Sequence, residues 1–600
     1  MFSFFVIPFC LGVVLLLGIS VWKYIRWIRG FDKRQQVVIR RNIWSWRFLP
    51  AIWEAFREGL LHWRITRHHF LLGYMHRSLA FGWFLLIVVG AVQAILACPD
   101  GHPFYVAIFF NFFEPRSERI VHFAQAPFYA DLMDVLLVYV LSGLFLAAFK
   151  RVWSRPLGMR HTTRHNLIDR VAKLSLWCIF PLRLLAEGAT SALYGNGGFL
   201  VAGLGSVMGA MGLDNEIFEY HLWVLYSLAL GTFFTLMPFT RYMHIFTEIF
   251  LIYFRQLGLH ETVRKDGYTL FELSACSRCG ICIDGCPVHD PLGIHDTQGV
   301  YLLQNIRNKD VWKQAERIAD NCLVCGRCSH DCPVQIDLEA IRRQVRTKGK
   351  EDIDKSQTYG YLKSIHPFNA MGRIGYFGGC MSHLTPGITE SMEHIFRAAG
   401  QDYWYMDRDR TICCGRPLLQ QGFVHQAEEL RRHNSELIAQ SGVMMLVTSC
   451  PICYQSFTKE YHLSIPVMHH SEYIAQLLKE QRIEVMPSAL RMTYHDPCEL
   501  GRGCGIYDAP REVLCATGQL VGTRHEREKS LCCGINLGDT VISGAQQAQV
   551  RDRAYQNLTE PQPDVVATAC PMCKKALARG GETPVKDIAE ITCECLNENI

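Results

Sequence analysis

Apolar residues are concentrated in five long stretches before residue 245, and no comparable stretch follows. Each stretch has roughly the 17–25 residues that a helix needs to cross a bilayer. The first lacks the basic start and small-residue cleavage site of a signal peptide, so we predict that it is retained. The pattern therefore predicts five membrane helices, over residues 4–21, 75–97, 132–149, 174–193 and 223–240.

Basic residues alternate between the loops of these helices. The loop after the first helix carries eleven Lys/Arg and the loop after the third carries seven, whereas the other two loops carry two and none. Loops rich in Lys and Arg stay on the cytoplasmic side. We therefore expect a multi-pass protein of the cytoplasmic (inner) membrane, with its N-terminus outside and everything after the fifth helix in the cytoplasm.

The hydrophobic pattern after the membrane region is that of soluble structure. An amphipathic segment, residues 245–267, continues from the fifth membrane helix. Residues 291–320 are predicted to form two helices, the second of them capped by Asp310. The charged stretch 342–356 reads as a linker. Beyond it, short apolar runs predict buried strands at 443–449 and 564–569, and periodic segments predict helices at 424–439 and 545–558, so the last part is α/β.

The cysteine count gives the first indication of chemistry. The chain has 25 cysteines in 600 residues and a net charge of only +5, which gives no support for nucleic-acid binding. Eighteen of the cysteines fall into motifs with metal-ligand spacing. Thiolates reserved for iron indicate a reducing compartment rather than a disulfide framework.

Two runs have the spacing C-x₂-C-x₂-C-x₃-C-P, between Cys276 and Pro287 and between Cys322 and Pro333. Zinc and disulfide sites rarely repeat a four-cysteine run in this form. The runs resemble those of two-cluster bacterial ferredoxins, in which three thiolates of one run and the fourth of the other hold each cubane [4Fe–4S] cluster. The resemblance implies two ligand sets: Cys276, Cys279, Cys282 with Cys332, and Cys322, Cys325, Cys328 with Cys286.

The last 230 residues contain an internal repeat. Each copy has one cysteine, then a Cys-Cys-Gly triplet, then C-x₂-C, and the offset between matching cysteines drifts only from 118 to 120 residues. Five cysteines exceed the four of a zinc site or an ordinary cubane. The candidate ligands are Cys380, Cys413, Cys414, Cys450 and Cys453 in the first copy, and Cys498, Cys532, Cys533, Cys570 and Cys573 in the second.

This repeat resembles the cysteine-rich CCG domain of the catalytic subunit of heterodisulfide reductase, which glycolate-oxidase iron–sulfur subunits share. The resemblance covers about residues 373–600 and implies a noncubane [4Fe–4S] cluster held by all five cysteines of each copy. Both copies are complete, so we expect two noncubane clusters in addition to the two cubanes.

Histidines near the cytoplasmic ends of the membrane helices are candidate haem ligands. His76 and His244 lie at one depth on different helices, which suits a b haem held from both faces. His221, at the outer end of the fifth helix, is a candidate for a second haem with His102 or His122. Buried charges in a membrane helix are costly, so Arg183 and Glu187 are either a structural ion pair or groups that contact a haem propionate or a quinone.

The membrane part, residues 1–250, resembles the cytochrome b subunit of respiratory nitrate reductase and the related heterodisulfide reductase subunit. Pro-Phe-Thr-Arg-Tyr-Met-His244 is the most specific piece of the resemblance. His76 and His244 match the cytoplasmic haem ligands of that family, whereas Leu86 and Tyr226 stand where the outer pair would be. One haem is therefore the primary expectation and two the alternative.

We thus expect a multi-domain protein: a five-helix membrane bundle, an α-helical dicluster ferredoxin module and two α/β CCG domains. The expected boundaries are 1–250 for the cytochrome b domain, 251–350 for the ferredoxin module, 351–372 for a linker, and 373–485 and 486–600 for the CCG domains.

This order of carriers predicts a quinone-linked iron–sulfur oxidoreductase. It would pass electrons between the quinone pool, with menaquinone expected, and a cytoplasmic partner at the CCG clusters. That partner is either a flavoprotein or a disulfide/thiol pair. The layout resembles fused electron-transferring-flavoprotein:menaquinone oxidoreductases, and no flavin or NAD fingerprint occurs in the chain. The alternative is a non-catalytic relay subunit, with further subunits, in a membrane complex of the sulfite-reduction type.

Overall fold

The computed structural model describes residues 4–97, 127–153, 163, 166–195, 197–260, 265–289, 291–307, 312–348, 350, 372–410, 412–536 and 541–597. The chain divides into two compact units, Met1–Gly280 and Ile281–Ile600. Each unit is described by itself. The predicted Asp310 cap, His102, His122 and residues 351–371 of the predicted linker lie outside the described residues.

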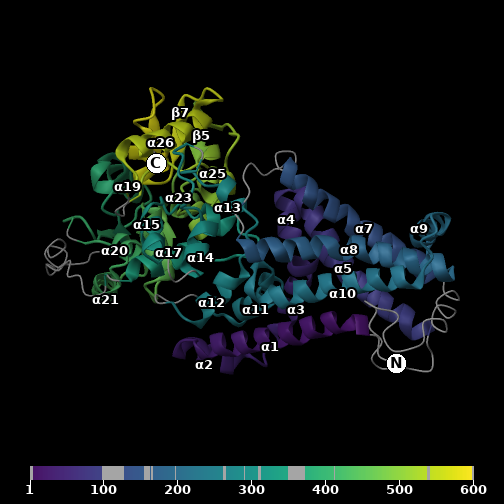
Figure 1. The fold of residues 1–600 in the computed structure, drawn as a ribbon. Coiled ribbons are helices and arrows are strands. Elements are labelled where there is room, and N and C mark those ends of the chain that lie inside the picture. Colours follow the sequence, from purple (N-terminus) through teal and green to yellow (C-terminus); the bar gives the residue numbers. More distant parts are fainter. Residues whose placement is uncertain are drawn as a thin grey trace. The chain divides into compact units, whose positions relative to one another are not determined.

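The described part of the first unit is α-helical, and within it five helices are long and apolar enough to cross a membrane (Figure 1). This confirms the five predicted spans, each of which continues further at one or both ends. The long helices are α1 (Ile7–Arg29), α5 (Phe70–Ala97), α7 (Pro127–Val152), α8 (Leu167–Tyr194) and α10 (Glu216–Leu236).

Helix α1 packs closely along α10. A Cβ atom added to Gly12 of α1 would lie 2.7 Å from the carbonyl oxygen of Gly231 on α10, so only glycine permits this approach. Small residues at helix crossings allow such backbone contact in membrane bundles. Around the long helices lie shorter ones: α2 (Lys33–Asn42), α3 (Phe48–Ala55), α4 (Trp63–His68), α9 (Phe199–Ala210), α11 (His244–Leu257) and α12 (Gly267–Ala275).

The second unit begins with short helices that surround the cysteine runs. The two predicted helical pieces are α14 and α15, and the remaining helices flank the cysteine loops. These elements are α13 (Ile281–Asp284), α14 (Gly299–Arg307), α15 (Trp312–Asp320), α16 (Arg327–His330) and α17 (Leu338–Thr347).

The prediction of a linker from residue 342 is wrong for its first six residues, which belong to α17. The Arg342 side chain is buried and donates hydrogen bonds to the carbonyl oxygens of Ile318, at 2.7 Å, and Thr297, at 2.8 Å. Arg346 donates to the Ala319 carbonyl at 2.7 Å. These arginines donate hydrogen bonds to the last carbonyl groups of α15, which have no partner within their own helix. The arginines of this stretch therefore cap a helix and are not exposed to solvent.

Each cysteine-rich copy is built on a four-stranded parallel sheet with helical crossovers. The strand orders are β2-β1-β3-β4 and β6-β5-β7-β8. The predicted strands are confirmed as β3 and β7. The strands are β1 (Ile374–Phe377), β2 (Tyr403–Tyr405), β3 (Met445–Thr448) and β4 (Val467–His469), then β5 (Arg491–His495), β6 (Gln519–Leu520), β7 (Val565–Thr568) and β8 (Val585–Asp587).

Parallel strands require crossover connections, and helices supply them here (Figure 1). Helices α21 and α26 confirm the two predicted helices of this region. In chain order the helices are α19 (Pro386–Ala398), α20 (Arg416–Gln421), α21 (Val424–Ser441), α22 (Pro451–Lys459) and α23 (His470–Lys479), then α24 (Gly501–Cys504), α25 (Asp508–Thr517), α26 (Gly544–Thr559), α27 (Pro571–Leu577) and α28 (Ile588–Glu594).

The sheets explain why distant cysteines meet. In open parallel sheets, ligands bind beyond the carboxyl ends of the strands. Cys380 follows β1, the Cys413–Cys414 pair follows β2, and Cys450 follows β3. The second copy repeats this placement around β5, β6 and β7. Each sheet therefore brings its five cysteines to one edge.

Candidate functional site

The five cysteines of the first copy form one contiguous group. The thiol of Cys414 hydrogen-bonds with the thiols of Cys413 and Cys453. The thiol of Cys453 also hydrogen-bonds with that of Cys450. Cys380 lies close enough to Cys450 and Cys414 for their charges to interact. Cys450 is the N-cap residue of α22 and Cys453 lies in the first turn of that helix, so both sulfurs lie at a helix N-terminus, which favours a bound negative group.

The second copy reproduces this arrangement. Cys533 hydrogen-bonds with Cys532 and Cys573, with the sulfurs of Cys533 and Cys573 3.5 Å apart, and Cys573 bonds with Cys570. Cys498 completes the group through interactions with Cys532 and Cys533. Thus all five predicted ligands of each copy converge, a donor set that suits an iron–sulfur cluster.

Burial makes most of these thiols hard to ionise without a metal. Burial, together with repulsion from the neighbouring Cys532, raises the pKa of the Cys498 thiol well above its usual range. The second cysteine of each pair behaves in the opposite way. Hydrogen bonds from Cys413 and Cys453 hold the pKa of the Cys414 thiol well below its usual range, and those from Cys532 and Cys573 do the same for Cys533.

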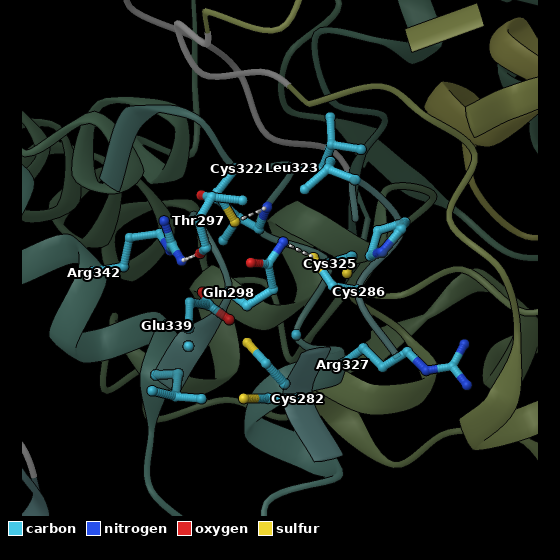
Figure 2. Close-up of a pocket in the computed structure, with 17 residues that line it drawn as sticks. Cys282, Cys286, Thr297, Gln298, Cys322, Leu323, Cys325, Arg327, Glu339 and Arg342 are labelled. Carbon is cyan, nitrogen blue, oxygen red and sulfur yellow. Dashed lines mark hydrogen bonds between the residues drawn. The ribbon is translucent and has the colours of Figure 1, made fainter. Parts of the chain in front are cut away.

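One of the two predicted cubane sites is a pocket within the second unit (Figure 2). Its lining contains the predicted set Cys286, Cys322, Cys325 and Cys328, together with Cys282. The backbone N–H of Val324 lies 3.3 Å from the Cys322 sulfur, which can accept its hydrogen bond. Buried thiols and a backbone donor suit an anionic cluster.

The two cubane loops share an unusual backbone conformation. Arg278 and Val324 occupy the same position in the two C-x₂-C runs and have φ of 56° and 49°, and the glycines two residues later, Gly280 and Gly326, are also left-handed. A β-branched residue such as Val324 is a genuine outlier there. Such strain persists at functional sites, where the loop must bring sulfurs and N–H groups to one point.

The other cubane set falls on both sides of the unit boundary. Cys276 and Cys279 belong to the first unit, and Cys282 and Cys332 to the second. This set therefore stays a prediction from its spacing and its ferredoxin resemblance.

The cubane pocket and the second cysteine-rich site are immediate neighbours. The thiols of Cys325 and Cys532 hydrogen-bond with each other, and both belong to one buried apolar cluster. Arg502 joins their loops: its Nε donates to the Cys325 carbonyl at 3.0 Å and its Nη1 to the Ser530 carbonyl at 2.9 Å. Carriers bound at these two sites would be separated by little more than their own ligands.

A second arginine connects the two copies to the ferredoxin module. Arg416 follows the Cys-Cys-Gly triplet of the first copy and is 2% exposed. It binds three carboxylates: Glu339 of α17 at 2.8 Å, Glu460 at 2.8 Å and Glu499, which follows Cys498, at 3.2 Å. Burial acts to lower the pKa of Arg416, but these carboxylates, Glu499 above all, outweigh it and raise the pKa, so the guanidinium remains charged.

The first unit contains a cavity of about 1050 Å³ that holds both predicted haem ligands. His76 and His244 line it with flat apolar side chains such as Trp83 and Phe233. The cavity extends to Cys279 of the first cubane run. Several cations also line it: Lys150, Arg170, Lys173, Arg241 and Arg278. Aromatic walls, two histidines on different helices and several cations suit a haem with its propionates.

The imidazole of His244 is oriented for metal binding. Its Nδ1 lies 2.7 Å from the Arg241 carbonyl oxygen, which can only accept, so Nδ1 carries the proton and Nε2 is the unprotonated nitrogen, the kind that ligates a metal. Sequence reasoning missed a third histidine. His62 lines the same cavity and its ring stacks on His76, with centroids 5.5 Å apart. The sequence did not indicate His62 as a ligand, because it lies in a basic loop outside the predicted membrane helices.

Other predicted membrane residues lie elsewhere. Arg183 and Glu187 form an ion pair of 2.9 Å, as their spacing predicts. The described residues that line the cavity include neither of them. His221 is exposed, with Nδ1 2.6 Å from the Ile217 carbonyl oxygen. Because its candidate partners lie outside the described residues, a second haem stays a prediction.

Comparison with known proteins agrees with this geometry. A cysteine-rich domain model matches residues 374–458 and 492–578, and a 4Fe-4S dicluster domain model matches residues 272–336. The chain is 24% identical to EtfAB:quinone oxidoreductase of Syntrophomonas wolfei, over 96% of this chain and 95% of that protein. It is 26% identical to one of the subunits of dihydromethanophenazine:CoB–CoM heterodisulfide reductase from Methanosarcina barkeri, over 56% of this chain and 97% of that protein.

The chain thus carries a 4Fe-4S dicluster domain and two cysteine-rich domains, and this part of it is similar to a heterodisulfide reductase subunit. Its fold class is the predicted one: apolar helices of membrane length, a helical ferredoxin region and two cysteine-rich α/β regions. The two domain models cover the cubane runs and both cysteine-rich copies, so [4Fe–4S] clusters are the cofactors that these models support.

Proposed function

We propose that this protein is a membrane-bound iron–sulfur oxidoreductase that passes electrons between the quinone pool and a cytoplasmic redox partner. The observation that carries the proposal is the pair of neighbouring sites in each unit. In the first unit, His76, His244 and Cys279 line one cavity. In the second, Cys325 and Cys532 are in contact. Both junctions suit one-electron transfer between adjacent carriers.

The residues have distinct roles in this proposal. His76 and His244 would hold one b haem, which supplies a one-electron carrier at the membrane. The cysteine runs would hold two cubanes, and the two copies would hold two noncubane clusters. Arg241 orients the His244 ring through its carbonyl, and Arg502 holds the loops of Cys325 and Cys532 at a fixed separation. The apolar side chains that line the cavity, such as Trp83 and Phe233, would limit the contact of a bound haem with water.

The relative that spans nearly the whole chain supports a flavoprotein as the cytoplasmic partner, because its name couples EtfAB to a quinone. The expected quinone is menaquinone, and the positive-inside pattern supports cytoplasmic placement of the iron–sulfur region. The cysteine-rich half also matches a heterodisulfide reductase component over 97% of that component's length, which favours disulfide/thiol chemistry as the second candidate.

Stopped-flow spectroscopy of the purified, detergent-solubilised chain tests the proposal. The chain is mixed anaerobically with reduced electron-transferring flavoprotein, with and without a menaquinone analogue. We expect rapid haem reduction, followed by reoxidation only where the quinone is present. Haem that responds to quinol and to a disulfide, and not to the flavoprotein, would support the second candidate. A chain that reacts with none of these without further subunits would be a relay subunit, contrary to the proposal.

A further inference from the structure

The two cysteine-rich copies differ at the residue that ends their first strand. Phe377 ends β1 and pairs with Thr448, and His495 ends β5 and pairs with Thr568. The 118-residue offset between Cys380 and Cys498 also relates these two positions. Register and sequence therefore agree that a phenyl ring in the first copy is replaced by an imidazole in the second.

Both rings are buried beside cysteines. Phe377 is 0% exposed and belongs to the apolar cluster that contains Cys450 and Cys453. His495 is 3% exposed. A ring nitrogen of His495 and the sulfurs of Cys533 and Cys573 all lie within 4.8 Å of one another. The second copy thus presents a sixth polar group to its cysteines at a place where the first copy presents only hydrocarbon.

Neighbouring contacts hold the backbone of His495 in place. The Thr568 hydroxyl lies 3.4 Å from the His495 carbonyl oxygen and donates to it. The carboxylate of the next residue, Asp496, is bound by Arg511 at 2.6 and 2.8 Å and by the backbone N–H of Arg527 at 2.7 Å. A ring on such a fixed strand end is pre-oriented toward the cysteines.

We propose that His495 donates an N–H hydrogen bond to a cysteine sulfur of the second site, and that the second site therefore has a higher reduction potential than the first. This rests on the proposed function, in which both copies carry clusters. A hydrogen bond to a cluster sulfur stabilises the more negative, reduced state and so raises the potential. A phenyl ring cannot do this, because it has no N–H.

A consequence concerns the order of carriers. The second site is the one that adjoins the cubane pocket, through Cys325 and Cys532. A higher potential there makes transfer from the first copy to the second the favourable direction, which suits electrons that travel from the cytoplasmic partner toward that cubane. In this scheme His495 is a positioning and tuning residue rather than a sixth ligand of the cluster.

Reciprocal exchange of the two residues in the full chain tests the inference. His495→Phe should lower the midpoint potential of one cluster signal in an EPR-monitored titration, and Phe377→His should raise that of the other. His495→Gln, which keeps an N–H donor, should stay near the wild-type value. The Phe variant should fold, because the equivalent buried site in the first copy already accepts phenylalanine.

Iron content separates the outcomes. Full iron in His495→Phe with an unchanged potential would overturn the inference and leave the proposed function intact. Loss of about one cluster's iron from His495→Phe would also overturn it, because the imidazole would then be a ligand. Pulsed EPR on protein labelled with ¹⁵N-histidine should show a weak nitrogen coupling; a strong coupling would indicate direct ligation. Wild-type protein without a cluster in the second copy would instead contradict the proposed function.

Discussion

Asp169 and Arg278 form a buried ion pair within the first unit, with side chains only 1% and 8% exposed. Asp169 lies in the first turn of α8, and Arg278 lies inside the first C-x₂-C of the cubane run. The same carboxylate accepts the backbone N–H of Arg241 at 3.1 Å, and the Arg241 carbonyl orients His244. One acidic side chain therefore connects a cubane loop to a candidate haem ligand.

Asp169→Asn should destabilise the first unit and slow haem reduction. Removing one partner of a buried ion pair leaves an uncompensated charge, which costs about 3–5 kcal/mol. Thermal unfolding in detergent should show a lower Tm, and stopped-flow absorption a slower haem phase. The matched control is Asp214→Asn, at an exposed position, which should behave as wild type. Equal Tm and equal haem kinetics for the two variants would contradict the structural role assigned to Asp169.

Arg502→Gln should slow electron exchange between the cubane pocket and the second cysteine-rich site while the iron is retained. The substitution removes the bonds to the carbonyls of Cys325 and Ser530, so the loops lose their fixed separation. Rapid-freeze EPR should show one cluster reduced well before the next. Arg491→Gln is the control, because Arg491 also donates to carbonyl groups but at an exposed edge. The prediction fails if both variants match wild type.

Arg416→Gln should be among the most destabilising single changes in the second unit. It leaves three carboxylates facing one another in a buried site, a loss of about 3–5 kcal/mol by analogy with other broken buried pairs. Adding Glu460→Gln should recover part of the loss, which a double-mutant cycle would measure. Arg432→Gln breaks only the exposed pair with Glu436 and should cost about 0–1 kcal/mol. A similar Tm for the two arginine variants would count against this.

His76→Ala and His244→Ala should each abolish the haem absorption band. Both imidazoles line the same cavity, and a six-coordinate b haem needs both. His221→Ala should leave the band unchanged if the protein holds one haem. His62→Ala tests the stacked third ring: we expect a shifted spectrum with haem retained. Complete haem loss from His62→Ala, with retention in His76→Ala, would reassign the ligand.

Cys533→Ala should remove the cluster of the second copy and lower the iron content by about four atoms per chain. Cys504→Ala is the control. Cys504 follows Cys498 in the sequence but belongs to none of the cysteine motifs, so we expect this substitution to leave the iron content unchanged. Removal of iron by a chelator should lower the Tm of the second unit, since metal binding contributes directly to folding free energy. An iron content that falls equally in both variants would refute the ligand assignment.

Much of this architecture follows from local patterns. The two four-cysteine runs, the duplicated five-cysteine motif and the five apolar stretches are each read within one segment, because loop spacing and helix length are local properties. The strands near 445 and 565 were likewise predictable from short apolar runs between the motifs. His76 and His244 could be predicted as haem ligands, because the ends of the predicted membrane helices give the depth of each histidine in the membrane.

Tertiary structure alone decided which sites are neighbours. That Cys325 meets Cys532 depends on how two modules pack, and no spacing along the chain encodes it. The charged stretch from Arg342 was predicted to be a linker because charge usually indicates exposure, yet its guanidinium groups are buried against the carbonyls of α15. His495, Arg416 and Arg502 gain their roles in the same way. A buried polar group is stabilised by partners distant in sequence, and only the fold brings those partners to it.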